Sequence, residues 1–138
     1  MIWLIESGHV DDGRQAFEAF TDERLPHLPK DAYWLATVVL LSDVAVSLTD
    51  LKRAAILHDL MRPYANSNAI AGSGSLYFGP VAYYLGRVAM LSSHSDDAVR
   101  HFETAMTVHE RMQTRPGLVQ VQIECASALL ARAGTTDR

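Results

Sequence analysis

The sequence predicts an all-α fold in which antiparallel helical hairpins stack side by side. Nearly half of the 138 residues (49%) are apolar, which is enough for one continuous core. Residues 76–113 show the pattern most clearly, because Ala98, Phe102 and Ala105 fall at i, i+4 and i+7 on one helix face. Small residues at Gly86 and Ala89 would let the preceding helix come close to that face.

Composition limits the function classes. The net charge of −4 and the isoelectric point near 5.8 argue against a nucleic-acid surface, which is normally basic. A single cysteine, Cys125, leaves no intramolecular disulfide to form, and the first six residues lack the features of a signal peptide. We therefore expect a cytoplasmic protein that makes no direct contact with nucleic acid.

Residues 32–48 are almost wholly apolar and could be mistaken for a membrane helix. The run is short for a membrane span, and Asp43 would be costly in hydrocarbon. A helix that is apolar on all sides is also what a stacked array needs where neighbours pack on both sides. We expect a buried helix and no membrane association.

The first half of the chain divides at its polar and proline-containing stretches. Residues 1–7 are expected to end one helix at Gly8, and a second helix runs from about Asp12 to Leu25 before Pro26. Asp31 is expected to cap the apolar third helix, and residues 48–50 connect it tightly to a fourth. The fourth helix bends or ends at Pro63.

The second half contains a polar break followed by three further helices. Residues 64–78 are small and polar and are expected to form a loop or a frayed turn. Gly79-Pro80 suits the start of the fifth helix, which ends near Leu91, and the sixth starts near Ser95 and extends towards Met112. We expect one domain, residues 1–138, with these parts: hairpins at about 1–25, 31–66 and 76–113, and a final helix at 117–133.

The spacing of small residues resembles that of tetratricopeptide repeats, in which Leu-Gly on one helix precedes an Ala on the next by about a dozen residues. Leu85-Gly86 and Ala98 match this spacing, and Ala16, Ala54 and Ala98 recur at intervals of 38 and 44 residues, longer than the usual 34. The resemblance implies a right-handed, tetratricopeptide-like α-α superhelix of about seven antiparallel helices. Strands, or these alanines exposed to water, would contradict it.

Five fragments in order extend the resemblance over most of the chain, from about Asp12 to Asp137. They are PHLPKDAYWLATVVLLSDVAVSL, LMRPYA, FGPVAYYLG, DDAVRHFETAM and ERMQTRPGLVQVQIECASALLARAG. Together they resemble the C-terminal helical-repeat region of large actinobacterial transcriptional regulators. Those proteins combine an ATPase module with a cyclase-like domain or a LuxR-type DNA-binding domain. The resemblance implies a sensor or scaffold segment of a larger signalling regulator.

No catalytic or metal-binding pattern is evident. The run AGSGS at residues 71–75 has no lysine near it, as a phosphate-binding loop requires. His94, His101 and His109 are spaced seven and eight apart, unlike the three-to-five spacing of zinc ligands. Helix capping explains the Asp11-Asp12 and Asp96-Asp97 pairs, and Cys125 suits a core position. We expect a protein that is not an enzyme and has no cofactor or metal.

The predicted function is binding of a protein or peptide on the concave face of the array. In tetratricopeptide arrays, the first helix of each pair lines this face. Counting from the alanine anchors, the face should carry Val39, Asp43, Val46, Tyr83, Arg87 and Met90. Tyr, Arg and Met are favoured at interfaces. Asp43 and Arg87 could equally pair with each other across adjacent helices, and both roles are compatible.

Two further hypotheses stay open. A small-molecule effector could bind between helices near Trp34, Tyr64 and Tyr83, since helix bundles form apolar pockets of this kind. Self-association as a homodimer could cover the apolar residues at the chain ends, namely the last helix and residues 2–5.

Overall fold

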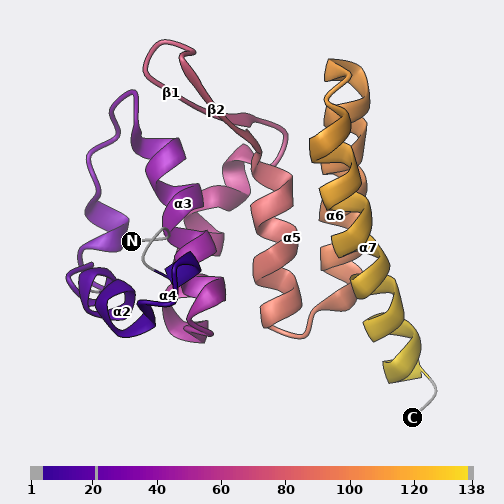
Figure 1. Ribbon diagram of the computed structural model, residues 1–138, viewed down its shortest axis with the longest axis horizontal. Helices are drawn as coiled ribbons and strands as arrows, with labels where there is room; N and C mark the ends of the chain where they lie inside the picture. The colour runs from indigo at the N-terminus through magenta and orange to yellow at the C-terminus, as the bar shows by residue number, and fades with distance from the viewer. Residues whose placement is uncertain (1–4, 21, 137–138) are drawn as a thin grey trace.

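The computed structural model describes residues 5–20 and 22–136 and is mainly helical (Figure 1). Six α-helices lie wholly within the described residues, together with two 3-10 turns and one pair of strands. They are α2 (Val10–Glu18), η1 (Leu25–His27), α3 (Trp34–Ser47), α4 (Leu51–Met61), η2 (Arg62–Tyr64), β1 (Asn68–Ala71), β2 (Leu76–Pro80), α5 (Val81–Leu91), α6 (Ser95–Met112) and α7 (Arg115–Thr136). None of the described helices is long and apolar enough to cross a membrane.

Helix α5 lies at the centre of the arrangement (Figure 1). The α3–α4 hairpin packs on one side of it and the α6–α7 hairpin on the other. Seven of its 11 residues are buried, so it contributes to two apolar clusters at once. This explains why its sequence is apolar on nearly every face.

The packing of α5 against α6 is as close as the small residues predict. Ala98, Phe102 and Ala105 are all fully buried. A Cβ atom placed on Gly86 would lie 2.5 Å from Cε1 of Phe102, so only a glycine leaves room for this ring. Leu85 is also completely buried, in the apolar cluster that α5 shares with α3 and α4.

Two of the three anchor alanines, Ala54 and Ala98, are completely buried, and Ala16 is partly buried. This agrees with the predicted stripe of small residues at helix contacts. The mainly helical fold is confirmed. The tetratricopeptide superhelix and its seven-helix count are not confirmed, and the strand pair at residues 68–80 meets one of the two conditions that count against the superhelix. The helix predicted at residues 1–7 falls largely outside the described residues.

The all-α prediction is wrong between residues 68 and 80, where the chain forms an antiparallel hairpin. Asn68 pairs with Pro80 and Ala71 with Leu76, with an irregularity between Ala69 and Ile70. Residues 72–74 all have positive φ, which makes the glycine-rich run a tight turn, whereas a loop or a frayed turn was expected over all of residues 64–78. Each strand has five residues or fewer, too short for alternation to stand out in the sequence. Residues 76–80 therefore do not belong to a helical hairpin.

Three helix boundaries also differ from the prediction. Helix α2 ends at Glu18, and Leu25 lies in the turn η1. Helix α7 begins at Arg115, because Gln113 adopts a left-handed conformation that ends α6 and proline is tolerated in a first turn. The range 117–133 was thus too short at both ends.

The aspartates near helix starts play several roles. Asp50 caps α4 by accepting a hydrogen bond from the Arg53 amide. Asp31 instead accepts one from the Tyr33 amide, in the turn before α3. The pairs Asp11-Asp12 and Asp96-Asp97 lie in the first turns of α2 and α6, where they favour the helix dipole without acting as caps.

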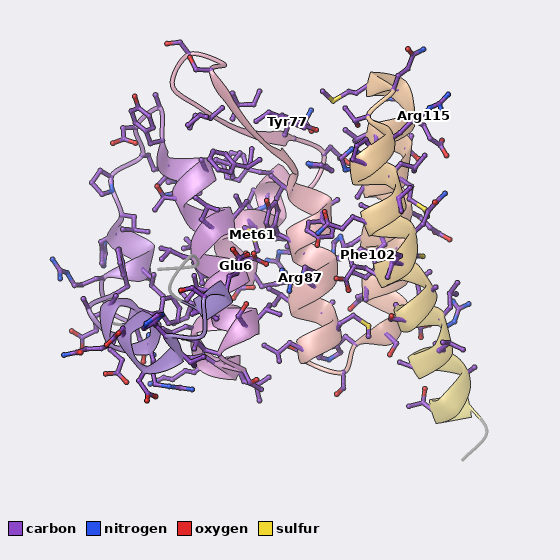
Figure 2. The ribbon with its side chains drawn as sticks, in the orientation of Figure 1. Glu6, Met61, Tyr77, Arg87, Phe102 and Arg115 are labelled. Atoms are coloured by element: carbon purple, nitrogen blue, oxygen red, sulfur yellow. The ribbon has the colours of Figure 1, made fainter. Side chains whose placement is uncertain are left out.

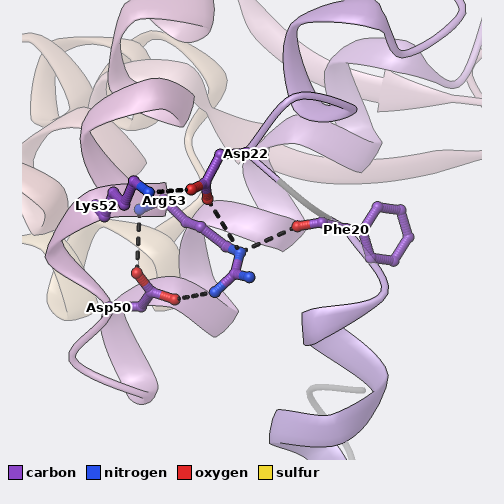
Figure 3. Close-up of polar contacts among 5 residues, drawn as sticks. All are labelled: Phe20, Asp22, Asp50, Lys52 and Arg53. Carbon is purple, nitrogen blue, oxygen red and sulfur yellow. Dashed lines mark hydrogen bonds and ion pairs between the residues drawn. The ribbon is translucent and has the colours of Figure 1, made fainter.

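A polar cluster around Arg53 holds the segment after α2 against α4 (Figure 3). The Arg53 side chain donates from Nε to the Phe20 carbonyl at 3.0 Å and from its terminal nitrogen to Asp50 at 2.6 Å. Its guanidinium also lies 5.3 Å from the centre of the Phe17 ring. Lys52 forms an ion pair with Asp22 at 2.5 Å. The Phe20 carbonyl therefore has its hydrogen-bond partner on α4 and not within α2, which accounts for the early end of α2.

Replacing Gly86 by alanine should destabilise the protein by about 1–3 kcal/mol, because the added methyl group forces the buried Phe102 ring to move. Urea unfolding followed by circular dichroism measures the effect. Gly134→Ala in α7 is the matched control, since its Cβ would meet nothing within 4 Å. Equal stability of the Gly86→Ala variant and the parent would contradict the close packing.

Replacing Arg53 by methionine should cost about 1–3 kcal/mol, because the Phe20 carbonyl and Asp50 lose a charged donor. Lys52→Met should change stability by less than about 0.5 kcal/mol, since the Lys52 side chain is 78% exposed. Thermal unfolding of both variants tests the difference. A larger loss in the lysine variant would show that Asp22, and not Arg53, holds the segment.

Candidate functional site

A pocket of about 620 Å³ opens where strand β2, helix α5 and the start of α7 meet. Its wall on the hairpin side is β2, and its opposite wall is the α6–α7 junction. Figure 2 marks these sides with Tyr77 and Arg115, and shows Arg87 on α5. The residues lining it are Asp43, Tyr77, Phe78, Gly79, Pro80, Tyr83, Tyr84, Arg87, His109, Gln113, Thr114, Arg115, Pro116, Gly117, Gln120 and Val121.

Three helices contribute charged side chains to one ion-pair group. Arg87 on α5 pairs with Asp43 on α3, and its Nε atom lies 3.9 Å from Oε1 of Glu124 on α7. The Asp43 and Arg87 side chains are each 22% exposed, so the pair is partly shielded from water. The predicted pairing of Asp43 with Arg87 is confirmed. The pair also lines the pocket, so it stays accessible to a ligand.

Tyr83 links α5 to α7 beside this group. Its hydroxyl oxygen accepts a hydrogen bond from the Gln120 side chain at 2.9 Å, and the Arg87 guanidinium lies 5.9 Å from its ring centre. Burial, with a smaller contribution from the Glu124 charge, raises the pKa of Tyr83 to about 12. The hydroxyl is therefore protonated at neutral pH and can donate a hydrogen bond to a ligand.

Tyr84 and Tyr77 hold the hairpin wall in place. The Tyr84 hydroxyl donates to the Phe78 carbonyl at 2.5 Å, and burial raises the pKa of Tyr84 to about 12. The Tyr77 hydroxyl lies 3.2 Å from the Asn68 side-chain oxygen and 3.4 Å from the Met112 sulfur at the end of α6. The hairpin is thus fixed to both α5 and α6.

The structure brings together three of the six predicted partner-binding residues: Asp43, Tyr83 and Arg87. Val39 is completely buried in the core, so its prediction as a binding residue is wrong. Val46 and Met90 are partly buried against the two apolar clusters and do not line the pocket. Counting helical turns from the anchor alanines identified Asp43, Tyr83 and Arg87 correctly. Packing between neighbouring helices, which this count does not include, decides which helix faces remain exposed.

Of the three aromatic residues suggested for a small-molecule site, Tyr83 lines this pocket, and Trp34 and Tyr64 do not. The rings of Trp34 and Tyr64 contact each other at 5.3 Å between centroids, and neither lines the pocket that contains Tyr83. Lys30 lies over the Trp34 ring at 5.2 Å. These two rings pack at the start of α3 and the turn η2, where they stabilise the fold.

Several lining residues could not be found from the sequence. Tyr77 lines the pocket because it lies on the unpredicted strand β2. Gly117 and Gln120 line it because they lie at the start of α7. A Cβ atom on Gly117 would overlap the His109 ring, so this glycine allows α7 to pack directly on α6. The only sequence signal was the doublet Tyr83-Tyr84, whose rings lie 5.2 Å apart between centroids and both line the pocket.

His109 is buried at the α6–α7 junction, at 6% exposure. Its Nδ1 atom lies 2.7 Å from the Thr114 hydroxyl. Burial lowers the pKa of His109, and burial together with the neighbouring His58 lowers that of His101. Both folded-state pKa values therefore lie below the value for an unfolded chain, near 6.5.

The described part of the chain contains no group of three or more His, Cys, Asp or Glu side chains arranged to hold a metal ion. Cys125 is buried among apolar residues of α6 and α7, and burial raises the pKa of its thiol. A raised pKa disfavours the thiolate, so this cysteine is a packing residue.

A second pocket, of about 790 Å³, lies beside residues 19–29. One continuous stretch of chain forms it, and it holds none of the predicted binding residues. The pocket beside α5 is better defined, because separate helices and a strand position its side chains.

Comparisons with known proteins give no assignment. No protein-family model matches the chain, and no curated protein or solved structure shows significant similarity to it. The site therefore has to be interpreted from its own geometry.

Stability should fall as the pH decreases from 7 to 5. Because the folded-state pKa values of His109 and His101 are lowered, their contribution is present above about pH 6.5 and is lost as the pH falls through the folded-state values. Urea unfolding at several pH values measures this dependence. His109→Gln should weaken it, whereas His27→Gln, at an exposed position, should leave it unchanged. An unaltered dependence in His109→Gln would contradict the role of this histidine.

Proposed function

We propose that this chain is a non-catalytic interaction domain that binds a segment of another protein in the pocket beside α5. The observation that carries the proposal is the set of polar and aromatic side chains from α3, α5 and α7 that converge there. These helices alternate with α4 and α6 along the chain, as expected for the lining of a concave face in a repeat array.

The pocket offers chemistry suited to a peptide. The Tyr83 O–H remains available as a donor, because its oxygen accepts from Gln120. The rings of Tyr77, Tyr83 and Tyr84 supply apolar area, and tyrosine and arginine are common binding hot spots. Helices and the anchored hairpin hold these groups in place, so little ordering is needed on binding.

A place in a transcriptional or signalling regulator follows from the resemblance to LuxR-type regulators and is part of the same proposal. Binding at the pocket would change the packing of α7 on α5 and α6, and a neighbouring domain would sense that change. A cytoplasmic location accords with the single, buried cysteine. The net charge of −4 argues against direct contact with nucleic acid.

The alternative is a small-molecule effector site in the same pocket. Its volume of about 620 Å³ falls within the range of ligand pockets, roughly 300–1,000 Å³. The ligand would pack on the tyrosine rings and contact Arg87. In this alternative the effector would contact Tyr83 but neither Trp34 nor Tyr64.

Filling the pocket with a large side chain should weaken peptide binding. Gln120→Trp puts a large ring on an exposed position of the pocket wall, and we expect at least a tenfold loss of affinity for peptides selected on an array. Gln122→Trp is the matched control, because Gln122 is an exposed position of the same helix outside the pocket. Fluorescence anisotropy measures both affinities.

Three outcomes separate the two functions. Peptide binding that only Gln120→Trp removes supports the interaction domain. A thermal shift with small molecules, lost in Gln120→Trp, supports the effector site. Peptide affinity that is equal in both tryptophan variants would overturn the proposed pocket.

A further inference from the structure

Strand β2 has a free edge, and this edge borders the pocket beside α5. Within the described residues the sheet consists of β1 and β2, so each strand is paired on one side only. Four consecutive residues of β2, from Tyr77 to Pro80, line the pocket, whereas no residue of β1 does. The pocket therefore lies beyond β2, on the side away from β1. The packing agrees, since β1 contacts mainly α3, and β2 contacts α5 and α6.

The lining pattern shows that the backbone of β2 borders the pocket. A strand that presents one face contributes every second residue, because successive side chains point to opposite faces. The irregularity beside Ala69 would place two neighbours of β2 on one face, but not four. Here four neighbours contribute, and one of them, Gly79, has no side chain. Main-chain atoms of β2 are therefore accessible from the pocket.

Most hydrogen-bonding groups of this edge are unused. In an antiparallel pair each strand bonds to its partner at alternate residues, and the N–H and C=O groups of the residues between them point outward. Among residues 76–79, the Phe78 carbonyl accepts a hydrogen bond from the Tyr84 hydroxyl. No other backbone group of this stretch bonds to a described residue outside the hairpin. The remaining outward groups are available to a ligand.

We propose that the partner segment binds in an extended conformation and adds to β2 as a third strand. This inference rests on the proposed peptide-binding function and defines how the peptide is held. Strands of one sheet lie about 4.8 Å apart, so the segment would lie directly against β2. Hydrogen bonds between main chains supply affinity, and the tyrosine rings of the pocket contact alternate side chains of the segment.

Two other occupants fit this edge less well. A helix bonds most of its backbone groups internally and is about 10–12 Å wide with its side chains, so it would leave β2 unpaired. A second copy of the chain would bring its own β2 together with the α6–α7 junction that forms the opposite wall of the pocket. In a two-fold pairing of β2 edges, each copy's wall would occupy the space that the other strand needs. A single extended segment needs only the space between β2 and that junction.

An N-methyl scan of a bound peptide tests the pairing. The probe is the tightest-binding array peptide, labelled with fluorescein and synthesised with one backbone amide methylated at a time. Methylation removes one N–H donor and keeps every side chain. We expect a roughly tenfold loss of affinity at alternate positions and less than about a twofold change between them, because a strand bonds to its neighbour at every second residue. The intervening positions are the matched controls, and fluorescence anisotropy measures each affinity.

Hydrogen exchange of the full chain gives a second measurement. Outward amides within residues 76–79 should exchange about fivefold more slowly when the unmodified peptide is bound, because they donate to its carbonyl groups. The Gln120→Trp variant, with the same peptide at the same concentration, should show no slowing. Exchange of these amides that stays the same with bound peptide would overturn the third strand.

The scan also separates this inference from the proposed function. A peptide that Gln120→Trp displaces, but that tolerates methylation everywhere or loses affinity equally at every position, would overturn the strand pairing and leave the interaction domain supported. Losses spaced three or four residues apart would indicate a bound helix and would overturn the pairing as well. If no array peptide depends on Gln120, both proposals fail.

Discussion

Helices α5 and α6 approach each other closely because Gly86 leaves space for the ring of Phe102. The position of the α6–α7 hairpin depends on this contact, since α7 packs mainly on α6 and meets α5 at fewer points. With a larger residue at position 86, α6 would move outward and carry α7 with it. The distance from Tyr83 to Gln120, which closes one side of the pocket, follows from that single close approach.

The pocket exists because several rigid parts meet without filling the space between them. Strand β2 runs directly into α5, and the Tyr84–Phe78 hydrogen bond fixes the angle between them. On the other side, Gly117 lets the first turn of α7 lie on His109. The ion pair of Asp43 and Arg87 lies between the two hairpins and satisfies two charges that would otherwise be costly to shield from water.

Helix α7 has two faces with different consequences. Its inner face completes the apolar cluster around Phe102, and its polar residues Gln120 and Glu124 reach the pocket. Its outer face exposes Val119, Ile123 and Leu130 to solvent.

Local pattern alone predicted the helices at residues 51–61, 81–91 and 95–112, because an apolar period of 3.6 residues, a proline at a start and a polar break at an end are short-range signals. It also identified the glycine beside Phe102, whereas the choice of the face that carries Asp43, Tyr83 and Arg87 came from the resemblance to tetratricopeptide arrays. These features depend on neighbours within a few turns of the chain.

Only the tertiary structure decided the remaining features. The strands at 68–80 are stabilised by pairing with each other and by the hydrogen bond from Tyr84. Helix α2 ends early because Arg53, 33 residues away from Phe20, donates a hydrogen bond to the Phe20 carbonyl. Val39 is buried because α3 is covered on both sides. The physical reason is common to all three cases: hydrogen bonds and burial between distant segments override local preference, and no local pattern encodes which segments meet.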